Sequence, residues 1–193
     1  MPDQVEDWSP ASSYEESAKC HKALGRIEDA LAAEEQALKF ELEVTNFGNA
    51  SFTCVRIAKL LITLERVPEA LAKYEESLEF TRDLLEASGH LLDLYNLVWS
   101  THGVASCLIA CERVAEAMSL LNENSDYAAR LEAEWGNDSN NLDTCAAYRE
   151  TQGRAALAIG DSTAGNVFAA HGASLRARIE RITRGEPDGD ANA

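Results

Sequence analysis

The chain has 193 residues, of which 46% are hydrophobic, and it carries a formal net charge of −16. This apolar content argues against a disordered chain, and the length suits one domain with a substantial core. The acidic charge argues against direct binding to nucleic acid or to an anionic membrane, because both carry charge of the same sign. Ala, Leu and Glu dominate and no stretch alternates at a period of two, so an all-α chain is predicted.

In chain order, residues 1–10 are predicted to be an extended leader. A helix over 11–24 should follow, because Ser12 and Ser13 each precede a glutamate by three residues, as in a capping box. Residues 46–49 are interpreted as a turn and residues 136–141 as a loop, since both are rich in Asn and Gly. Further helices are expected over 27–45, 51–64, 67–87, 90–111, 114–135, 142–158 and 163–183. The polar segment 184–193 is expected to be a disordered tail.

One eight-residue sequence recurs along the chain. It reads LGRIEDAL at 24–31, LERVPEAL at 64–71 and CERVAEAM at 111–118, and a weaker fourth copy begins near Ile159. The corresponding residues Gly25, Glu65, Glu112 and Gly160 recur at intervals of about 40–48 residues, a period that indicates stacked structural repeats. The turn in the fourth copy is expected to be about two residues longer than the others.

Each copy is predicted to form the turn of a helical hairpin. Small residues stand seven positions before the turn residue (Ala18, Ala58, Ala105 and Gly153) and, in the first three copies, five positions after it (Ala30, Ala70 and Ala117). Two helices can approach closely only where neither carries a bulky side chain at the crossing. Acidic residues early in each second helix also suit the positive end of the helix dipole.

This pattern resembles the tetratricopeptide repeat (TPR) family, including its later small–Leu pairs at 37–38, 77–78 and 174–175. The resemblance covers residues 11–183 and implies an α-α superhelix, a solenoid of about four antiparallel hairpins. The period matches the long variety of about 40–47 residues, as in kinesin light chains and bacterial signalling proteins, and exceeds the usual 34. Asn124 stands where a small residue is expected, which leaves the register of the third and fourth repeats open.

In that family the first (A) helix of each hairpin lines the concave face and the second (B) helix forms most of the convex face. The expected A helices sum to a charge of about +1, so the acidity lies elsewhere in the chain. The groove-facing residues that this implies, together with the aromatic stripe around Trp99, are Lys19, Lys22, Phe52, Arg56, Lys59, Tyr95, Trp99, His102, Ser106 and Arg154. Such a groove would suit an acidic peptide segment or a terminal carboxylate. Alternatively, the B helices simply collect solvated glutamates and the Trp99 stripe packs against a neighbouring helix.

No pattern points to catalysis, a metal or a cofactor. Cys107 and Cys111 are four residues apart but lack further ligands at suitable spacing, so they are expected to pack as small apolar groups. The histidines form no triad, and carboxylate pairs such as Glu34–Glu35 are expected to be solvated. The most apolar run, 91–111, contains polar residues that argue against a membrane span. The N-terminus shows no secretory signal, which predicts a cytoplasmic chain with reduced cysteines.

The leading hypothesis is a non-catalytic protein–protein interaction module that binds a segment of a partner protein, acidic in character, in the concave groove. The alternative is a self-associating regulatory or structural scaffold whose acidic convex surface binds a basic partner. A homo-oligomer is compatible with both. Fold alone does not choose between them, because helical repeats support many functions.

Overall fold

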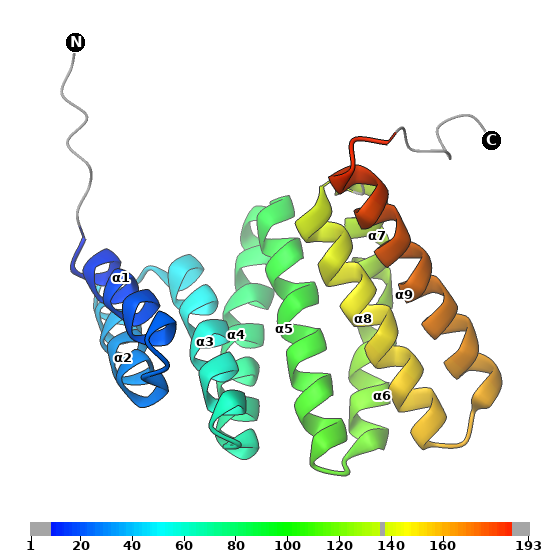
Figure 1. Ribbon diagram of the computed structural model, residues 1–193, viewed down its shortest axis with the longest axis horizontal. Helices are drawn as coiled ribbons and strands as arrows, with labels where there is room; N and C mark the ends of the chain where they lie inside the picture. Colours follow the sequence, from blue (N-terminus) through cyan, green and yellow to red (C-terminus); the bar gives the residue numbers. More distant parts are fainter. Residues whose placement is uncertain (1–8, 136–137, 187–193) are drawn as a thin grey trace. The chain divides into compact units, whose positions relative to one another are not determined.

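The computed structural model describes residues 9–135 and 138–186. Within these ranges the chain folds into nine α-helices joined by short turns, which confirms the all-α prediction (Figure 1). Most of the predicted leader and tail lies outside the described residues. The contacts group the chain into two compact units that divide between Leu84 and Leu85, inside one helix, and each unit is described by itself. No helix in the described ranges is both long enough and apolar enough to cross a membrane.

The first unit holds α1 (Pro10–Ala23), α2 (Ile27–Glu43), α3 (Phe47–Thr63) and most of α4 (Val67–Ser88). Helix α1 packs on α2, and α2 packs on α3. Helix α4 is joined to α3 by the buried Ser77 hydroxyl, which donates to the Ser51 carbonyl at 2.9 Å. Each helix therefore contacts the next one along the chain, as stacked hairpins require.

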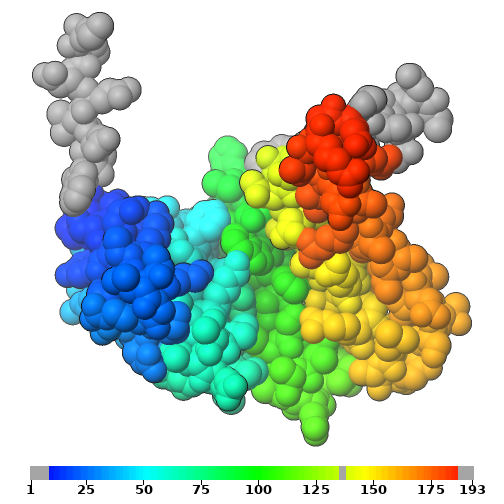
Figure 2. All heavy atoms as spheres, in the orientation of Figure 1, coloured from blue at the N-terminus to red at the C-terminus, as the bar shows by residue number. Residues whose placement is uncertain are grey.

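The second unit holds α5 (Leu91–Ala110), α6 (Val114–Glu123), α7 (Ser125–Trp135), α8 (Ser139–Ala158) and α9 (Ser162–Thr183). Helix α8 packs against α5 on one side and α9 on the other, and it also contacts α6 and α7. Figures 1 and 2 show this order, with α8 in yellow between α5 in green and α9 in orange and red.

The four copies of the eight-residue sequence form the same turn. Gly25, Glu65, Glu112 and Gly160 have positive φ angles of 71°, 60°, 61° and 87°. In each turn the following N–H donates back across the helix end: Arg26 to the His21 carbonyl and Asp161 to the Ala156 carbonyl, both at 2.9 Å. This is the Schellman arrangement, which satisfies carbonyl groups left over at a helix end.

The expected extra length of the fourth turn was wrong. Residues 159–161 separate α8 from α9, just as residues 24–26 separate α1 from α2. The small residue five positions after Gly160 is Gly165, which takes the place that alanine holds in the other copies. A Cβ atom added to Gly153 would lie 3.1 Å from the Gly165 carbonyl oxygen, so the two helices touch backbone to backbone at this point.

The small residues predicted to lie at helix crossings are all buried. Ala18 is 2% exposed, and Ala30, Ala58, Ala70, Ala105 and Ala117 are 0% exposed. These positions are equivalent in successive hairpins, and each would lose its close packing if a larger side chain were present. The structure therefore confirms the repeat unit that the sequence pattern predicts.

Several helix starts differ from prediction because a polar side chain caps them earlier. Ser9, rather than Ser12 or Ser13, caps α1 by accepting the Ser12 N–H at 3.2 Å. Asn46 caps α3, so residues 47–49 are helical instead of part of the turn predicted over 46–49. Asp138 caps α8, so residues 139–141 are helical, while residues 136–137 lie outside the described ranges. Side-chain oxygens at these positions accept N–H groups that the helix itself leaves unpaired.

The single helix predicted over 114–135 is two helices, α6 and α7, separated at Asn124. The Asn124 side chain is buried, and its amide donates to the Leu120 carbonyl at 2.8 Å. Asparagine side chains compete in this way with the helical hydrogen bonds of the backbone. The residue that broke the repeat pattern in the sequence is therefore also the residue at which the helix breaks.

We predict that Ala70→Leu destabilises the chain by about 1–3 kcal/mol, because the larger side chain overpacks a helix crossing. Ala72→Leu is the matched control, since Ala72 lies on the same helix and is exposed. Thermal unfolding followed by circular dichroism should show a lower Tm for the first variant only. Equal melting temperatures for the two variants would contradict the close crossing at Ala70.

Candidate functional site

The predicted site residues lie on the A helices, in both units. Lys19 and Lys22 are on α1, and Phe52, Arg56 and Lys59 are on α3, in the first unit. The second unit contributes Tyr95, Trp99, His102 and Ser106 from α5 and Arg154 from α8.

In the first unit, Arg56 is held by carboxylates of the chain itself. Its Nε lies 2.9 Å from both oxygens of Glu34 on α2, and its Nη2 lies 2.9 Å from Glu15 on α1. Nη2 also contacts the Thr53 hydroxyl at 2.7 Å. Arg56 therefore ties three helices together, and its charge is balanced before any partner arrives.

The remaining positive charge on this face is modest. Lys19 pairs with Glu16 at 2.6 Å, an exposed contact between side chains three residues apart. Lys22 and Lys59 are exposed, and Phe52, one helical turn before Arg56 on α3, is half-buried. The first unit is thus less cationic than the charge of its A helices indicates.

Two acidic side chains on α2 point inward. Glu34 is 4% exposed and Glu41 is 1% exposed, and they lie seven residues apart on the buried face of the helix. Burial raises the pKa of Glu34 even though Arg56 contacts it. Burial also raises the pKa of Glu41, and the nearby Thr53 and Arg56 only partly oppose it. Neither Glu41 oxygen accepts a hydrogen bond within the described residues. The expectation that Glu34 would be solvated was wrong.

We predict that Glu41→Gln raises the free energy of unfolding at pH 7 by about 1 kcal/mol, because it removes a buried charge that lacks a partner. A raised pKa favours the protonated acid in the folded state. The acid therefore contributes stability below its unfolded pKa of about 4.3 and loses it as pH rises through the folded pKa.

The difference in Tm between variant and wild type should thus grow as pH rises from about 4 to 7. Glu43→Gln, on the same helix but exposed, should show no such trend. A pH-independent difference for Glu41→Gln would contradict the assignment of the buried acid.

In the second unit, α5 presents a half-exposed stripe. Tyr95, Trp99, His102 and Ser106 are partly exposed, while most residues between them are buried. The steps of four, three and four residues place the stripe along one side of the helix. The rings of Tyr95 and Trp99 meet edge to face, with centroids 5.4 Å apart and planes at 68°. Burial raises the pKa of the Tyr95 phenol.

The C-terminal part of this stripe, His102 and Ser106, meets α8 in a cluster of polar side chains. His102 Nδ1 lies 2.9 Å from the Thr151 hydroxyl. Arg154 Nη2 donates to Ser106 Oγ at 3.0 Å and to Thr151 Oγ1 at 3.1 Å. Thr151 is fully buried and donates to the Ala147 carbonyl at 2.9 Å, so its oxygen accepts from its neighbours. The structure therefore brings His102, Ser106 and Arg154, all named from the sequence, to one place.

Two acidic residues of α8 share one arginine of α9. Arg176 Nε lies 3.0 Å from Glu150, and its Nη1 forms an ion pair with Asp143. Arg176, Glu150 and Arg154 also line a shallow hollow between α8 and α9, close to the glycine contact of these helices. Arg176 thus offsets part of the negative charge of α8, and both carboxylates are engaged by it rather than by Arg154.

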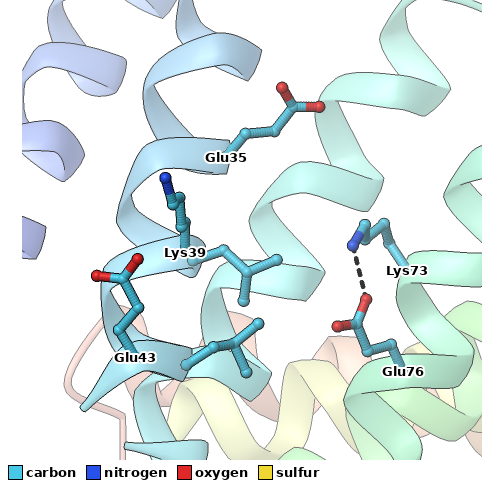
Figure 3. A pocket seen from close by; sticks show the side chains of 7 residues that line it. Glu35, Lys39, Glu43, Lys73 and Glu76 are labelled. Atoms are coloured by element: carbon cyan, nitrogen blue, oxygen red, sulfur yellow. Dashed lines mark hydrogen bonds and ion pairs between the residues drawn. The ribbon is translucent and has the colours of Figure 1, made fainter. Parts of the chain in front are cut away.

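A second hollow lies between the B helices α2 and α4 (Figure 3). Leu38 and Leu42 form its apolar floor. Its rim carries Glu35, Lys39, Glu43, Lys73 and Glu76. Figure 3 shows Lys73 paired with Glu76, at 2.6 Å. The rim therefore carries both acidic and basic side chains. The side chains that line the hollow do not form a cluster of like charge that would bind one kind of ligand.

The cysteines show no sign of a metal or redox site. All five are free thiols, and Cys54, Cys107 and Cys145 are buried. Burial raises the pKa of Cys54 and of Cys145 to about 12, so both thiols stay protonated at neutral pH. In the described ranges no three His, Cys, Asp or Glu side chains are grouped so that they could hold a metal ion.

Sequence reasoning missed Thr151, Glu34 and Glu41. Glu34 and Glu41 fall at the apolar spacing of α2, among the buried Ala30, Leu31, Ala37 and Leu38. That spacing was a usable signal, because a polar residue inside a helical apolar stripe is expected to be buried. Thr151 gave no such signal, since its role depends on a contact between α5 and α8.

Comparisons with known proteins agree with this architecture. No protein-family model matches the chain, and no curated protein matches its sequence. Among solved structures, BtubC (BKLC) from P. vanneervenii superimposes with a TM-score of 0.69 and 16% identity, over 98% of this chain and 72% of that chain.

A Podosopora anserina protein with nearly identical TPR-like repeats, described as a kinesin light chain, gives a TM-score of 0.63 and 20% identity, covering 93% of this chain and 81% of that one. A variant of it gives 0.65 and 18%, over 92% and 81%. At such low identity these likenesses show the fold, and they confirm the predicted resemblance to long-period TPR-like repeats.

Proposed function

We propose that this TPR-like repeat protein is a non-catalytic interaction module that binds a segment of a partner protein on its A-helix faces. TPR-like folds are generally protein-interaction modules, and they are typically non-catalytic. The main contact would be the surface of α5 and α8, which we call the α5/α8 face: Tyr95, Trp99, His102, Ser106 and Arg154. On the first unit, Lys19, Lys22, Phe52, Arg56 and Lys59 would add further contacts. Lys19 and Arg56 would contribute less than an unpaired cation, because carboxylates of the chain already pair with them.

The observation that carries this proposal is the stripe on α5. Two aromatic rings in contact, both half-exposed, continue along the same helix side into the polar cluster around Arg154. Tyr and Trp contribute strongly to interfaces, because they offer a large apolar area together with a polar group and lose little conformational freedom. Such a surface can anchor an apolar side chain and pair a neighbouring acidic group.

The charges favour an acidic or neutral segment over a basic one on this face. Arg154 makes no ion pair within the described residues, while Arg176 pairs with Asp143 and Glu150 nearby and offsets part of their charge. The rest of the surface is strongly acidic, since the chain carries 33 acidic residues and 17 lysines and arginines. A positively charged residue within an acidic surface would favour ligands whose own acidic group falls at that residue. An acidic group of the ligand placed elsewhere would be repelled by the surrounding carboxylates.

We predict that Tyr95→Ala and Trp99→Ala each weaken binding of a partner segment at least about tenfold, which corresponds to about 1.4 kcal/mol. The ligands would be peptides selected on the full-length chain from a random display library, with Kd measured by calorimetry. Tyr127→Ala is the matched control, because Tyr127 is an exposed tyrosine on α7 in the same unit. It should change Kd less than twofold.

The scaffold alternative predicts a different ranking. Binding would then depend on acidic B-helix residues such as the exposed Glu75 and would weaken steeply with salt, since the screening length falls to about 3 Å at 1 M. A larger effect of Glu75→Lys than of Tyr95→Ala would reject the A-helix proposal in favour of the scaffold.

A further inference from the structure

Arg154 differs from most arginines of the chain in its partners. Arg26, Arg66, Arg113 and Arg130 each pair with a carboxylate three or four residues away. Arg154 instead donates to two hydroxyl groups, Ser106 on α5 and Thr151 on its own helix. Neutral hydroxyls position a guanidinium group without cancelling its charge.

The contacts also fix the direction of the guanidinium. Both of its hydrogen bonds involve Nη2, at 3.0 and 3.1 Å, and Thr151 is anchored in the interior by the Ala147 carbonyl. Within the described residues, Nε and Nη1 contact no acceptor, and the residue is exposed. Three N–H groups are therefore available at a position that is already ordered, which lowers the entropic cost of binding an anion.

Other polar groups stand beside it. Ser106 Oγ lies 3.4 Å from His102 Nδ1 and 3.4 Å from Thr151 Oγ1. The Thr151 hydroxyl donates to the Ala147 carbonyl, so Ser106 is the hydroxyl of this cluster that can donate to a ligand. The nearest carboxylate along the helix, Glu150, is occupied by Arg176. The cluster thus offers donors from two helices, Ser106 on α5 and Arg154 on α8, and a guanidinium that contacts no carboxylate within the described residues.

From this geometry we infer that Arg154, Ser106 and His102 form a receiving site for a phosphoryl group carried by the bound segment. This inference rests on the proposed function, because it specifies the ligand of the same face. A phosphoryl group presents three acceptor oxygens and nearly two negative charges at neutral pH, which suits donors that converge from two helices. A carboxylate has two oxygens and one charge and would satisfy fewer of them.

The stripe on α5 sets the expected spacing within the ligand. Trp99 and Ser106 are two helical turns apart on one side of α5, which is about 10.5 Å along the axis. An extended peptide covers this distance in about three residues. The favoured ligand therefore carries an aromatic or large apolar residue about three positions from a phosphorylated serine or threonine.

The first experiment needs no peptide. Phenyl phosphate and benzoate are titrated separately into the isotope-labelled full-length chain, and amide chemical shifts are followed by NMR. Phenyl phosphate should shift the amides of residues 102–106 and 151–154, and benzoate should bind at least tenfold more weakly. Arg154→Gln should abolish these shifts. Arg82→Gln is the control of equal charge change, since Arg82 is an exposed arginine on α4, and it should leave them intact.

The second experiment uses synthetic peptides with one phenylalanine and one phosphoserine separated by zero to six residues, together with their serine and glutamate counterparts. The phosphopeptide whose phosphoserine lies about three positions from its phenylalanine should bind best to the wild-type chain. It should bind at least tenfold more tightly than the same peptide with serine or glutamate in place of phosphoserine. Arg154→Gln should remove this preference, and Arg154→Lys should retain only part of it because lysine lacks the planar fork.

The outcomes separate the two proposals. Peptides that bind in a Trp99-dependent manner but show no preference for phosphoserine would overturn the phosphoryl site and leave the interaction module standing. Phenyl phosphate shifts that depend on Arg154, with no peptide bound through Trp99, would support the anion site and reject the proposed segment-binding function. Equal binding of phenyl phosphate and benzoate would overturn the choice of a phosphoryl group.

Discussion

The close approach of paired helices at small residues is the constraint on which the rest of the structure depends. Alanine or glycine stands at equivalent positions on both sides of each crossing, and all of these residues are buried. The turn fixes where the crossing falls, because the Schellman hydrogen bonds end the first helix at a set residue and only three residues separate it from the second helix. A change in either feature would shift the register of every side chain on the following helix.

Ion pairs on the surface of the turns and ion pairs between helices have different roles in this chain. Arginines at the turns pair with nearby carboxylates on the surface, where such contacts contribute little to stability. Arg56 instead joins α1, α2 and α3 through Glu15 and the buried Glu34. A buried ion pair is costly to form but also costly to break, because removal of one partner leaves the other charge desolvated. An arginine that looks like a ligand contact in the sequence is thus part of the scaffold of the first unit.

The sequence predicted the fold well because its signal repeats. The eight-residue turn, the alanines around it and the helical spacing are local features, and each copy supports the others. The errors arose where one side chain decides the outcome: Asn124 splits a helix, and Asn46 and Asp138 begin helices earlier than the turn-forming composition indicated. Within the site, the α5 stripe could be predicted from spacing alone. The pairing of Arg56 with Glu34 and the role of Thr151 could not, because both depend on contacts between helices that are distant in sequence.

The proposed phosphoryl site would also show how a strongly acidic protein can bind an anion. Long-range repulsion between charges is screened within about 10 Å at moderate salt, so binding depends on the groups at the site itself. There, Arg176 offsets part of the charge of Asp143 and Glu150, and the hydroxyls of Ser106 and Thr151 hold Arg154 without neutralising it. An anion placed close to acidic side chains elsewhere on the surface would be repelled. Selectivity would come from this contrast between one ordered cation and its acidic surroundings.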